Sequence, residues 1–276
     1  MSSPRISAII PTFNRAHLLP RAVDSILSQT LPPHSVIIVD DGSTDGTEKL
    51  IKKNYPEIKY LKQDNLGVSA ARNAGITATS CEWLAFLDSD DEWLPEKLAR
   101  QMEVLNLAPA MKICHSDEIW IRNGKRVNPL KKHSKSGGWM FKKALPICCI
   151  SPSSAMIHRS VFDNVGLFEE SLPACEDYDL WLRVTSSYPV LYISEKLVVK
   201  HGGHQNQLSE KYWGMDRFRI QALENIILSG NLSDENLNDA KQMLQEKTKI
   251  FSNGARKRGR TAEAEKCEQR MEAILG

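Results

Sequence analysis

Three carboxylates stand close together directly after the apolar run that begins at Trp83: Asp88, Asp90 and Asp91. The run is typical of a buried strand, and side chains of an extended segment alternate in direction, so Asp88 and Asp90 point to the same side. Carboxylate oxygens are the hard ligands that Mg²⁺ or Mn²⁺ prefers, and such an ion leaves positions for phosphate oxygens. The spacing predicts a divalent-metal site, with a solvated turn or a helix cap as the alternative.

The elements that position this cluster alternate between strand and helix patterns. Four apolar runs are typical of strands, and each ends in polar residues: 6–10, 36–39, 58–61 and 83–87. Helical patterns lie between and after them: 18–29, 45–53, 67–77 and 95–107. Asp45 with Glu48 forms a capping-box pattern at the start of the second helix. This order predicts an α/β protein with a parallel sheet covered on both faces, in which ligands bind beyond the carboxyl ends of the strands.

The turn after the first predicted strand, PTFNRAHL, contains no glycine. The GxGxxG fingerprint of dinucleotide-binding proteins is therefore absent, and so is the GxxxxGK[ST] loop of P-loop NTPases. A nucleotide bound without a glycine loop needs a carboxylate for the base, an aromatic face, a cation for the diphosphate and a metal ion. Asp41, Phe13, Arg72 and the Asp88 cluster are the candidates for these parts.

Six motifs in order resemble those of the family 2 glycosyltransferases with the GT-A fold: IIPTFNR, SILSQT, VIIVDDGSTDGT, NLGVSAARNAG, FLDSDD and CEDYDLWLR. The resemblance covers roughly residues 5 to 205. It implies a GT-A nucleotide-diphospho-sugar transferase fold with a mostly parallel central sheet and helices on both faces. It also implies metal-dependent, inverting transfer of a sugar from a nucleotide-diphosphate donor, most often a UDP-sugar, to an acceptor hydroxyl.

The resemblance also assigns the residues at the donor end. The nucleoside-contacting segment corresponds to four consecutive residues: Pro11, Thr12, Phe13 and Asn14. Asp41 matches the acid that reads the uracil, and Arg72 a cation near the base or the diphosphate.

Asp88 and Asp90 match the DxD motif of the family, with Asp90 as the direct metal ligand and Asp88 nearer the ribose or a metal-bound water. Asp91 is an alternative metal ligand. His201 is expected to complete the metal shell, with His204 as a weaker candidate. A lone histidine is also typical of an ordinary structural position, and Lys200 would contact phosphate instead.

Glu176 and Asp177 open a segment with helical apolar spacing. Taken alone, acids in a first helical turn complement the helix dipole. In the resemblance, Asp177 is the general base that takes the proton from the acceptor hydroxyl, and Glu176 holds the acceptor or supports the base. One base suffices for an inverting, in-line displacement.

We expect a GT-A domain over residues 1–208, with a nucleotide-binding half of about 1–107 and an acceptor half of about 108–208, followed by a C-terminal helical extension over 209–276. Asn123-Gly124 predicts a hairpin turn. Residues 131–139 are expected to form a flexible loop, as an ordinary surface loop or as a wall of the acceptor site, with Trp139 and Phe141 available to stack on a sugar. The extension would pack on the sheet, form a homodimer surface or rest on a membrane.

Composition indicates a globular protein, since 276 residues with 41% hydrophobic content can bury a sizeable core. The net charge of +2 argues against a nucleic-acid partner. No apolar segment approaches the ~20 residues that span a bilayer, and the N-terminus shows no signal-peptide pattern. We expect a cytoplasmic protein, with association at the inner face of the membrane as the alternative.

The expected partners are a UDP-sugar and a carbohydrate or lipid-linked acceptor, in cell-surface glycan or polysaccharide assembly. Two readings from other classes stay open. One is a catalytically silent sugar-nucleotide-binding or scaffold protein, and the other is a nucleotidyltransferase. The latter needs a basic triphosphate loop near the N-terminus, of which PTFNR is a poor version.

Overall fold

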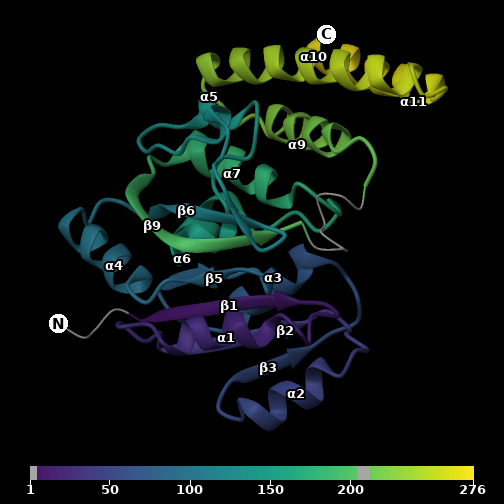
Figure 1. Ribbon diagram of the computed structural model, residues 1–276. Coiled ribbons are helices and arrows are strands. Elements are labelled where there is room, and N and C mark those ends of the chain that lie inside the picture. Colours follow the sequence, from purple (N-terminus) through teal and green to yellow (C-terminus); the bar gives the residue numbers. More distant parts are fainter. Residues whose placement is uncertain (1–4, 204–211) are drawn as a thin grey trace.

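The computed structural model describes residues 5–203 and 212–276 (Figure 1). Strands and helices alternate through the first 107 residues, as predicted. The elements of this part are β1 (Ile6–Thr12), α1 (Leu19–Leu27), β2 (Ser35–Asp40), α2 (Thr47–Asn54), β3 (Lys59–Lys62), α3 (Val68–Thr77), β4 (Trp83–Phe86), β5 (Glu92–Trp93) and α4 (Lys97–Leu107). The short strand β5 is an addition to the predicted order.

The remaining part of the chain completes the sheet and adds helices. Its elements are β6 (Ile113–Arg122), β7 (Lys125–Val127), α5 (Phe141–Ala144), β8 (Ala155–His158), α6 (Arg159–Val165), α7 (Glu176–Ser187), β9 (Leu191–Gly202), α9 (Asp216–Leu228), α10 (Asp234–Arg256) and α11 (Thr261–Leu275). The predicted hairpin is confirmed, because Asn123 and Gly124 both have positive φ and join antiparallel β6 and β7.

The strands form one sheet in the order β3-β2-β1-β4-β8-β6-β9-β5, with β7 pairing β6. The strands β1 to β4 are mutually parallel, as predicted. Because β8 runs antiparallel between β4 and β6, β6 and its parallel neighbour β9 point in the same direction as β1 to β4. The expectation of a mostly parallel sheet is confirmed, and the carboxyl ends of six strands therefore point the same way.

Helices cover both faces of this sheet. Successive side chains of a strand point to opposite faces, so apolar residues on both faces need helices to pack against. On β1, Ala8 and Ile10 belong to an apolar cluster with residues of α1, α2 and α4. Ile9, between them, belongs to the other large cluster, with residues of α3, α6 and α7. This arrangement confirms the predicted α/β class.

The C-terminal helices share the second of these clusters. Leu223 of α9 and Leu244 of α10 are fully buried in the cluster that contains Trp181 of α7. In Figure 1, α10 and α11 lie at the opposite end of the molecule from β3 and α2. These helices therefore pack on the α7 side of the body, while the predicted domain boundary near residue 208 stays a prediction. Within residues 5–203 and 212–276, no helix is long and apolar enough to cross a membrane.

The second helix begins one residue later than the capping-box pattern predicts, because Gly46 and not Asp45 is its N-cap residue. Asp45 accepts a hydrogen bond from the backbone N of Thr47 at 3.1 Å and another from the backbone N of Ala16 at 2.8 Å. Glu48 pairs with Lys52 at 2.7 Å. Glu48 therefore stabilises the helix by an ion pair on its surface. Asp45 connects the loop after β1 to the start of α2.

The segment expected to be a flexible loop, residues 131–139, is held by specific contacts. Lys135 forms an ion pair with Glu118 of β6, with 2.9 Å between Nζ and Oε1, and both side chains are buried. Gly138 bridges to Val190 through two backbone hydrogen bonds. Low hydrophobicity suggested solvation, whereas a buried charge pair and a backbone bridge fix this segment against the sheet.

Candidate functional site

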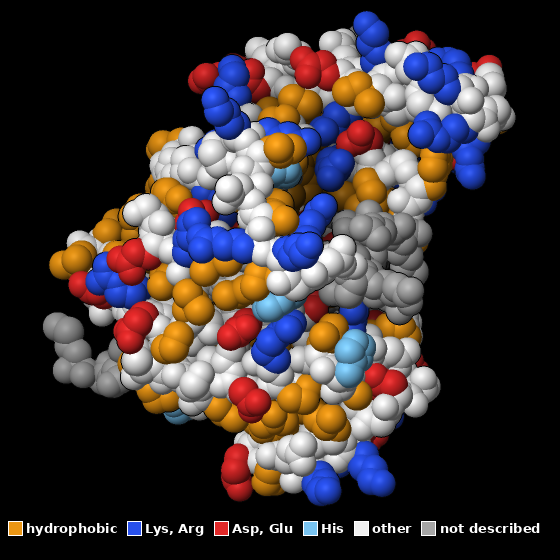
Figure 2. All heavy atoms as spheres, viewed as in Figure 1, with side chains coloured by type: hydrophobic (Ala, Val, Ile, Leu, Met, Phe, Trp, Pro, Cys, Tyr) orange, Lys and Arg blue, Asp and Glu red, His pale blue; other side chains and the backbone are white. Residues whose placement is uncertain are grey.

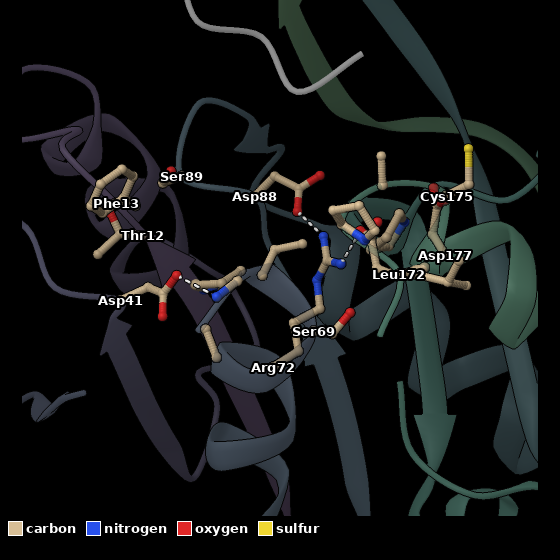
Figure 3. A pocket seen from close by; sticks show the side chains of 18 of the residues that line it. Thr12, Phe13, Asp41, Ser69, Arg72, Asp88, Ser89, Leu172, Cys175 and Asp177 are labelled. Carbon is tan, nitrogen blue, oxygen red and sulfur yellow. Dashed lines mark hydrogen bonds and ion pairs between the residues drawn. The ribbon is translucent and has the colours of Figure 1, made fainter. Parts of the chain in front are cut away.

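A cavity of about 1200 Å³ opens at the carboxyl ends of β1, β2 and β4, and the starts of α3 and α7 line its walls. Every residue predicted for the site within the described chain lines it: Pro11, Thr12, Phe13, Asn14, Asp41, Arg72, Asp88, Asp90, Glu176, Asp177 and His201. Figure 3 shows Phe13 and Asp41 on one side, Asp177 on the other, and Arg72 between them. His204 lies outside the described residues.

Arg72 joins the two sides of this cavity. Its Nη2 donates to Asp88 Oδ1 at 2.7 Å and its Nη1 to Glu176 Oε1 at 2.6 Å (Figure 3). The side chain is buried, and the ring of Phe168 lies 5.1 Å from its guanidinium carbon. Burial alone would lower the pKa of Arg72, but Asp88 and Glu176 raise it above its ordinary value. The guanidinium is therefore a permanent cation that ties α3 to the end of β4 and to the start of α7.

Glu176 and Asp177 occupy the first turn of α7, and their side chains have different environments. Glu176 is buried, and burial raises its pKa while Arg72 opposes the shift. Asp177 is half-buried, and its Oδ1 accepts from the backbone N of Tyr178 at 2.7 Å. Cys175 precedes the helix in the left-handed conformation with φ of 63°, which turns the chain sharply before the two acids. The result is one acid locked in an ion pair and one that faces the cavity.

Asp41 fixes the loop that leads into α3. Its Oδ1 accepts from Gln63 Nε2 at 2.7 Å and from the backbone N of Leu66 at 2.9 Å, and its Oδ2 accepts from the backbone N of Gly67 at 2.9 Å. Only 4% of Asp41 is exposed. An ionised carboxylate has about four acceptor positions, so one remains for a further N–H donor.

The segment after β1 presents several types of group to the cavity. Phe13 has 43% of its surface exposed, whereas Thr12 is buried and its Oγ1 has no hydrogen-bond partner within the described parts of the chain. Asn14 adopts a positive φ of 51°, and its Oδ1 accepts from the backbone N of Thr44 at 2.8 Å. This side-chain bond holds the turn next to the loop after β2. The exposed ring of Phe13 and the unpaired hydroxyl of Thr12 therefore lie at the same edge of the sheet.

The aspartates after β4 point in different directions. Asp88 faces the cavity and Arg72, while Asp91 is buried and accepts from Ser153 Oγ at 2.7 Å and from the backbone N of His201 at 3.1 Å. Burial raises the pKa of Asp91 well above its ordinary value, although Lys200 opposes the shift. In the described residues, no three His, Cys, Asp or Glu side chains are gathered closely enough to hold a metal ion. Asp88 and Asp90, which would hold a metal, therefore have no third such ligand gathered beside them in the described chain.

His201 provides an observation that fits such an ion. Its Nε2 is buried without a hydrogen-bond partner in the part of the chain that is described, and it lies 3.5 Å from Glu92 Oε2. Burial lowers the pKa of His201, which favours the neutral imidazole that binds metals. Two carboxylates and a neutral imidazole suit Mn²⁺ by donor type.

The structure adds residues that the sequence patterns did not indicate. Cys148 lines the cavity beside Asp177, and Arg219 of α9 reaches it from the C-terminal helices. No spacing pattern relates these positions to the motifs, because they come from a loop and from a distant helix. Of the two aromatic residues expected to stack on a sugar, Trp139 is exposed, whereas Phe141 is buried in the core and unavailable.

Comparison with known proteins assigns the chain to a family. A sequence profile described as "Glycosyl transferase family 2" matches residues 7–166. An uncharacterised glycosyltransferase of Rickettsia typhi is 33% identical over 219 residues, which span 74% of this chain and 66% of the relative. One of a Nostoc species is 35% identical over 163 residues, spanning 56% of this chain and 51% of the relative. The chain thus spans less than two thirds of the length of these relatives.

Solved structures share the fold. Staphylococcus aureus TarS 1–349 in complex with UDP-GlcNAc has a TM-score of 0.70 and 19% identity, covering 88% of this chain and 71% of that chain. The mannosyltransferase PcManGT from Pyrobaculum calidifontis, in complex with GDP-Man and Mn²⁺, has a TM-score of 0.64 and 18% identity, covering 99% and 88%. Such identities establish the fold alone, and they confirm the predicted GT-A architecture. Since the family profile matches more than half of the sequence, the chain belongs to glycosyl transferase family 2.

Proposed function

We propose that the protein is an inverting glycosyltransferase that moves a sugar from a nucleoside-diphosphate donor, with a UDP-sugar as the expected type, to an acceptor hydroxyl. The observation that carries this proposal is that Asp177 faces Phe13 and Asp41 across one cavity, with Arg72 bridged between the two sides. Two structural neighbours bound to UDP-GlcNAc and GDP-Man support a nucleotide-sugar donor.

The donor end would bind the nucleoside through three contacts. The exposed ring of Phe13 would stack on the base, Asp41 would accept from a base N–H, and the unpaired Thr12 Oγ1 would bond the nucleoside. Pro11 and Asn14 would hold the backbone of this segment in place. The segment after β1 carries no phosphate-cradling glycine motif, so other groups would bind the diphosphate.

The diphosphate would lie at the end of β4. By donor type, Asp90 and Asp88 with His201 would hold Mn²⁺ or Mg²⁺ there. When bound, the ion would neutralise the negative charge of the departing nucleoside diphosphate. Arg72 adds a fixed positive charge next to Asp88 and keeps that carboxylate oriented toward the cavity.

Asp177 would act as the general base at the other side. The acceptor oxygen attacks C1 of the donor sugar and forms the new C–O bond, while the bond from C1 to the diphosphate oxygen breaks and its electron pair leaves with the diphosphate. The hydroxyl proton passes to Asp177. Glu176 has its carboxylate in the Arg72 ion pair, so it would support the base by fixing the start of α7.

We extend the proposal to the organisation of the chain. Residues 1–107 supply Phe13, Asp41 and the Asp88 cluster, and residues 108–208 supply Asp177 and part of the wall around it, to which Met215 and Arg219 also contribute. This supports a nucleotide-binding half and an acceptor half within a GT-A domain over residues 1–208. The acceptor would be a carbohydrate or a lipid-linked glycan of the cell surface.

Replacing Asp177 with Asn tests the base. The change should lower turnover by about 10²- to 10⁴-fold, since that is the typical contribution of a general base, and leave donor binding unchanged. Asp64→Asn makes the same chemical change on an exposed carboxylate outside the cavity and should be silent. Normal turnover in Asp177→Asn would overturn the assignment.

Thermal-shift measurements would identify the donor class. The ligands are UDP, GDP, CDP and dTDP and their sugars, each with Mn²⁺, with Mg²⁺ and with EDTA. A ligand that binds the folded state raises the melting temperature by mass action. Metal-dependent stabilisation by one nucleotide would support the donor site and the metal. Nucleotide binding without turnover toward any acceptor would favour the silent scaffold instead.

A further inference from the structure

A second cavity, of about 530 Å³, lies next to the catalytic one and is strongly basic. It is lined by Lys132, Lys143, Arg219 and Lys247, with Asp216 as its only carboxylate among the described lining residues. Figure 2 shows Lys and Arg side chains around a hollow below the C-terminal helices. We call this cavity the basic pocket. Its cations come from distant parts of the sequence, so the fold brings them together.

The positive charge of the basic pocket is not balanced by its own residues. Asp216 Oδ1 lies 2.8 Å from Arg219 Nη1 and 3.6 Å from Lys247 Nζ, so one carboxylate serves two cations. Lys143 Nζ donates to the neutral Ser136 Oγ at 2.8 Å. Four cations against one acid leave three positive charges on the described lining. Such an excess in a concave site is typical of one that binds an anion.

Lys247 shows the imbalance most directly. Its side chain is 8% exposed, and its Nζ donates to the backbone O of Pro146 at 2.9 Å. Burial lowers its pKa and Arg219 adds to that shift, while Asp216 opposes it. The desolvation cost of this buried ammonium would be offset by an anion with several acceptor oxygens. Such an anion would bind Lys247, Lys143 and Arg219 together.

The basic pocket adjoins the base side of the catalytic cavity. Arg219 lines both cavities. Cys175 lies two residues before Asp177, and its Sγ lies 3.9 Å from the backbone O of Met215 at the start of α9. The donor end, at Asp88, belongs to the first cavity only. An anion in the basic pocket would therefore belong to the acceptor.

We propose that the basic pocket binds a phosphate group of the acceptor and so places the acceptor hydroxyl at Asp177. This inference rests on the proposed function and names the class of its acceptor: a glycan or polyol that carries a phosphodiester or diphosphate. A neutral sugar acceptor would leave the three excess positive charges of the described lining unbalanced. Two sources share this chemistry, a water-soluble phosphodiester and the diphosphate of a lipid-linked sugar.

The first experiment measures binding of inorganic pyrophosphate and of glycerol phosphate by calorimetry, at constant ionic strength and without divalent metal. Lys143→Met and Lys247→Met should each weaken binding about tenfold or more, since each removes a charge-assisted hydrogen bond. Lys142→Met is the matched control, because Lys142 is the neighbouring residue on α5, is exposed and pairs with Asp239 outside the pocket. Lys143 is half-buried, so Lys143→Met keeps the test valid if Lys247→Met fails to fold.

The second experiment separates this inference from the proposed function. Donor binding and acceptor-free hydrolysis of the donor should be unchanged in Lys143→Met, while KM for a phosphate-bearing acceptor rises. A glycerol phosphate oligomer and a polyprenyl-diphosphate sugar in detergent micelles are the two acceptor arms, and the arm that supports transfer identifies the source. Equal pyrophosphate binding in wild type, Lys143→Met and Lys247→Met would overturn the basic pocket alone. Absence of donor binding in the wild type would overturn the proposed function itself.

Discussion

The Sγ of Cys148 lies 3.2 Å from Asp177 Oδ2 and 3.2 Å from the backbone O of Ile150, so its one S–H proton is shared between a carboxylate and a carbonyl acceptor. Burial raises the pKa of this thiol well above its ordinary value, and the negative charge of Asp177 adds to the shift. Cys148 therefore stays protonated and remains a donor. The hydrogen bond favours one orientation of the carboxylate that we propose as the base.

Cys148→Ala should lower kcat by about two- to tenfold, because a thiol is a weak donor and one net hydrogen bond is worth about 0.5–1.5 kcal/mol. Cys148→Ser supplies a stronger donor in nearly the same place and should retain most of the activity. Steady-state kinetics with saturating donor measures both. Equal losses in the two variants would show that the site needs the volume of the sulfur, and would contradict an orienting role.

Arg72→Met should destabilise the protein strongly, because it leaves Glu176 as a buried carboxylate without its partner. Removing one member of a buried ion pair costs about 3–5 kcal/mol. Urea denaturation measures this loss. Asp88 also loses its partner in this variant, but it is more exposed and should contribute less.

The double variant Arg72→Met with Glu176→Gln separates the bridge from a simple packing effect. A neutral amide has a smaller desolvation cost than a carboxylate, so the double variant should recover part of the lost stability. Activity should stay low, since the link between α3, β4 and α7 is still missing. A double variant as unstable as Arg72→Met would argue that the guanidinium acts by packing on Phe168 instead.

Lys97→Met should stabilise the protein at neutral pH. Lys97 is fully buried, its Nζ lies 4.1 Å from the Trp93 ring centre, and it donates to Gln101 Oε1 at 2.7 Å. Burial lowers its pKa from 10.5 to about 7. The unfolded chain therefore binds more protons between about pH 7 and 10.5, and stability from this group rises with pH across that window.

The gain from Lys97→Met should be largest near pH 6 and shrink toward pH 10. At about 1.4 kcal/mol for each pKa unit, the shift corresponds to a pH-dependent difference on the order of 5 kcal/mol, less the lost bond to Gln101. Chemical denaturation of both proteins at several pH values gives the difference directly. A difference that does not change with pH would show that the pKa of Lys97 is the same in the folded and the unfolded protein, and would contradict the lowering of this pKa by burial.

The first four strands could be predicted because each apolar run ends in polar residues, and a parallel sheet places those ends together. Phe13, Asp41, Asp88 and Asp177 were identified in this way and by family motifs, and all line one cavity. The Arg72 bridge could not be predicted, because Glu176 lies 104 residues away and only the packing of α7 brings it close.

Buried charges explain most of the remaining differences between expectation and structure. Hydrophobicity patterns treat every lysine as a surface residue, so they did not predict that Lys135 and Lys97 are buried. The basic pocket is a similar case, since its four cations lie on four separate segments of the chain. Whether a charge is buried depends on long-range packing, which local spacing does not encode.

The Lys135 ion pair makes a prediction about acid stability. Burial would raise the pKa of Glu118, but Lys135 and Lys200 lower it to about 2. The stability that Glu118 contributes is therefore complete above about pH 4.5, its unfolded value, and is lost as the pH falls from there to about 2. Lys135→Met should remove much of this contribution and cost up to about 3–5 kcal/mol at neutral pH, because Glu118 is 2% exposed and would keep only the hydrogen bond from Trp120 Nε1 and the charge of Lys200.

The matched control is Lys131→Met, which changes an exposed lysine of the same segment and should be silent. Denaturation at pH 7 and at pH 4 should show Lys135→Met losing less on acidification than wild type, since protonation removes the charge of a buried Glu118 that has lost its ion pair with Lys135. Proteolysis adds a second measurement: cleavage within residues 131–139 should become faster in Lys135→Met only. Equal acid sensitivity and equal cleavage in both variants would mean that the Gly138–Val190 bridge alone holds the segment.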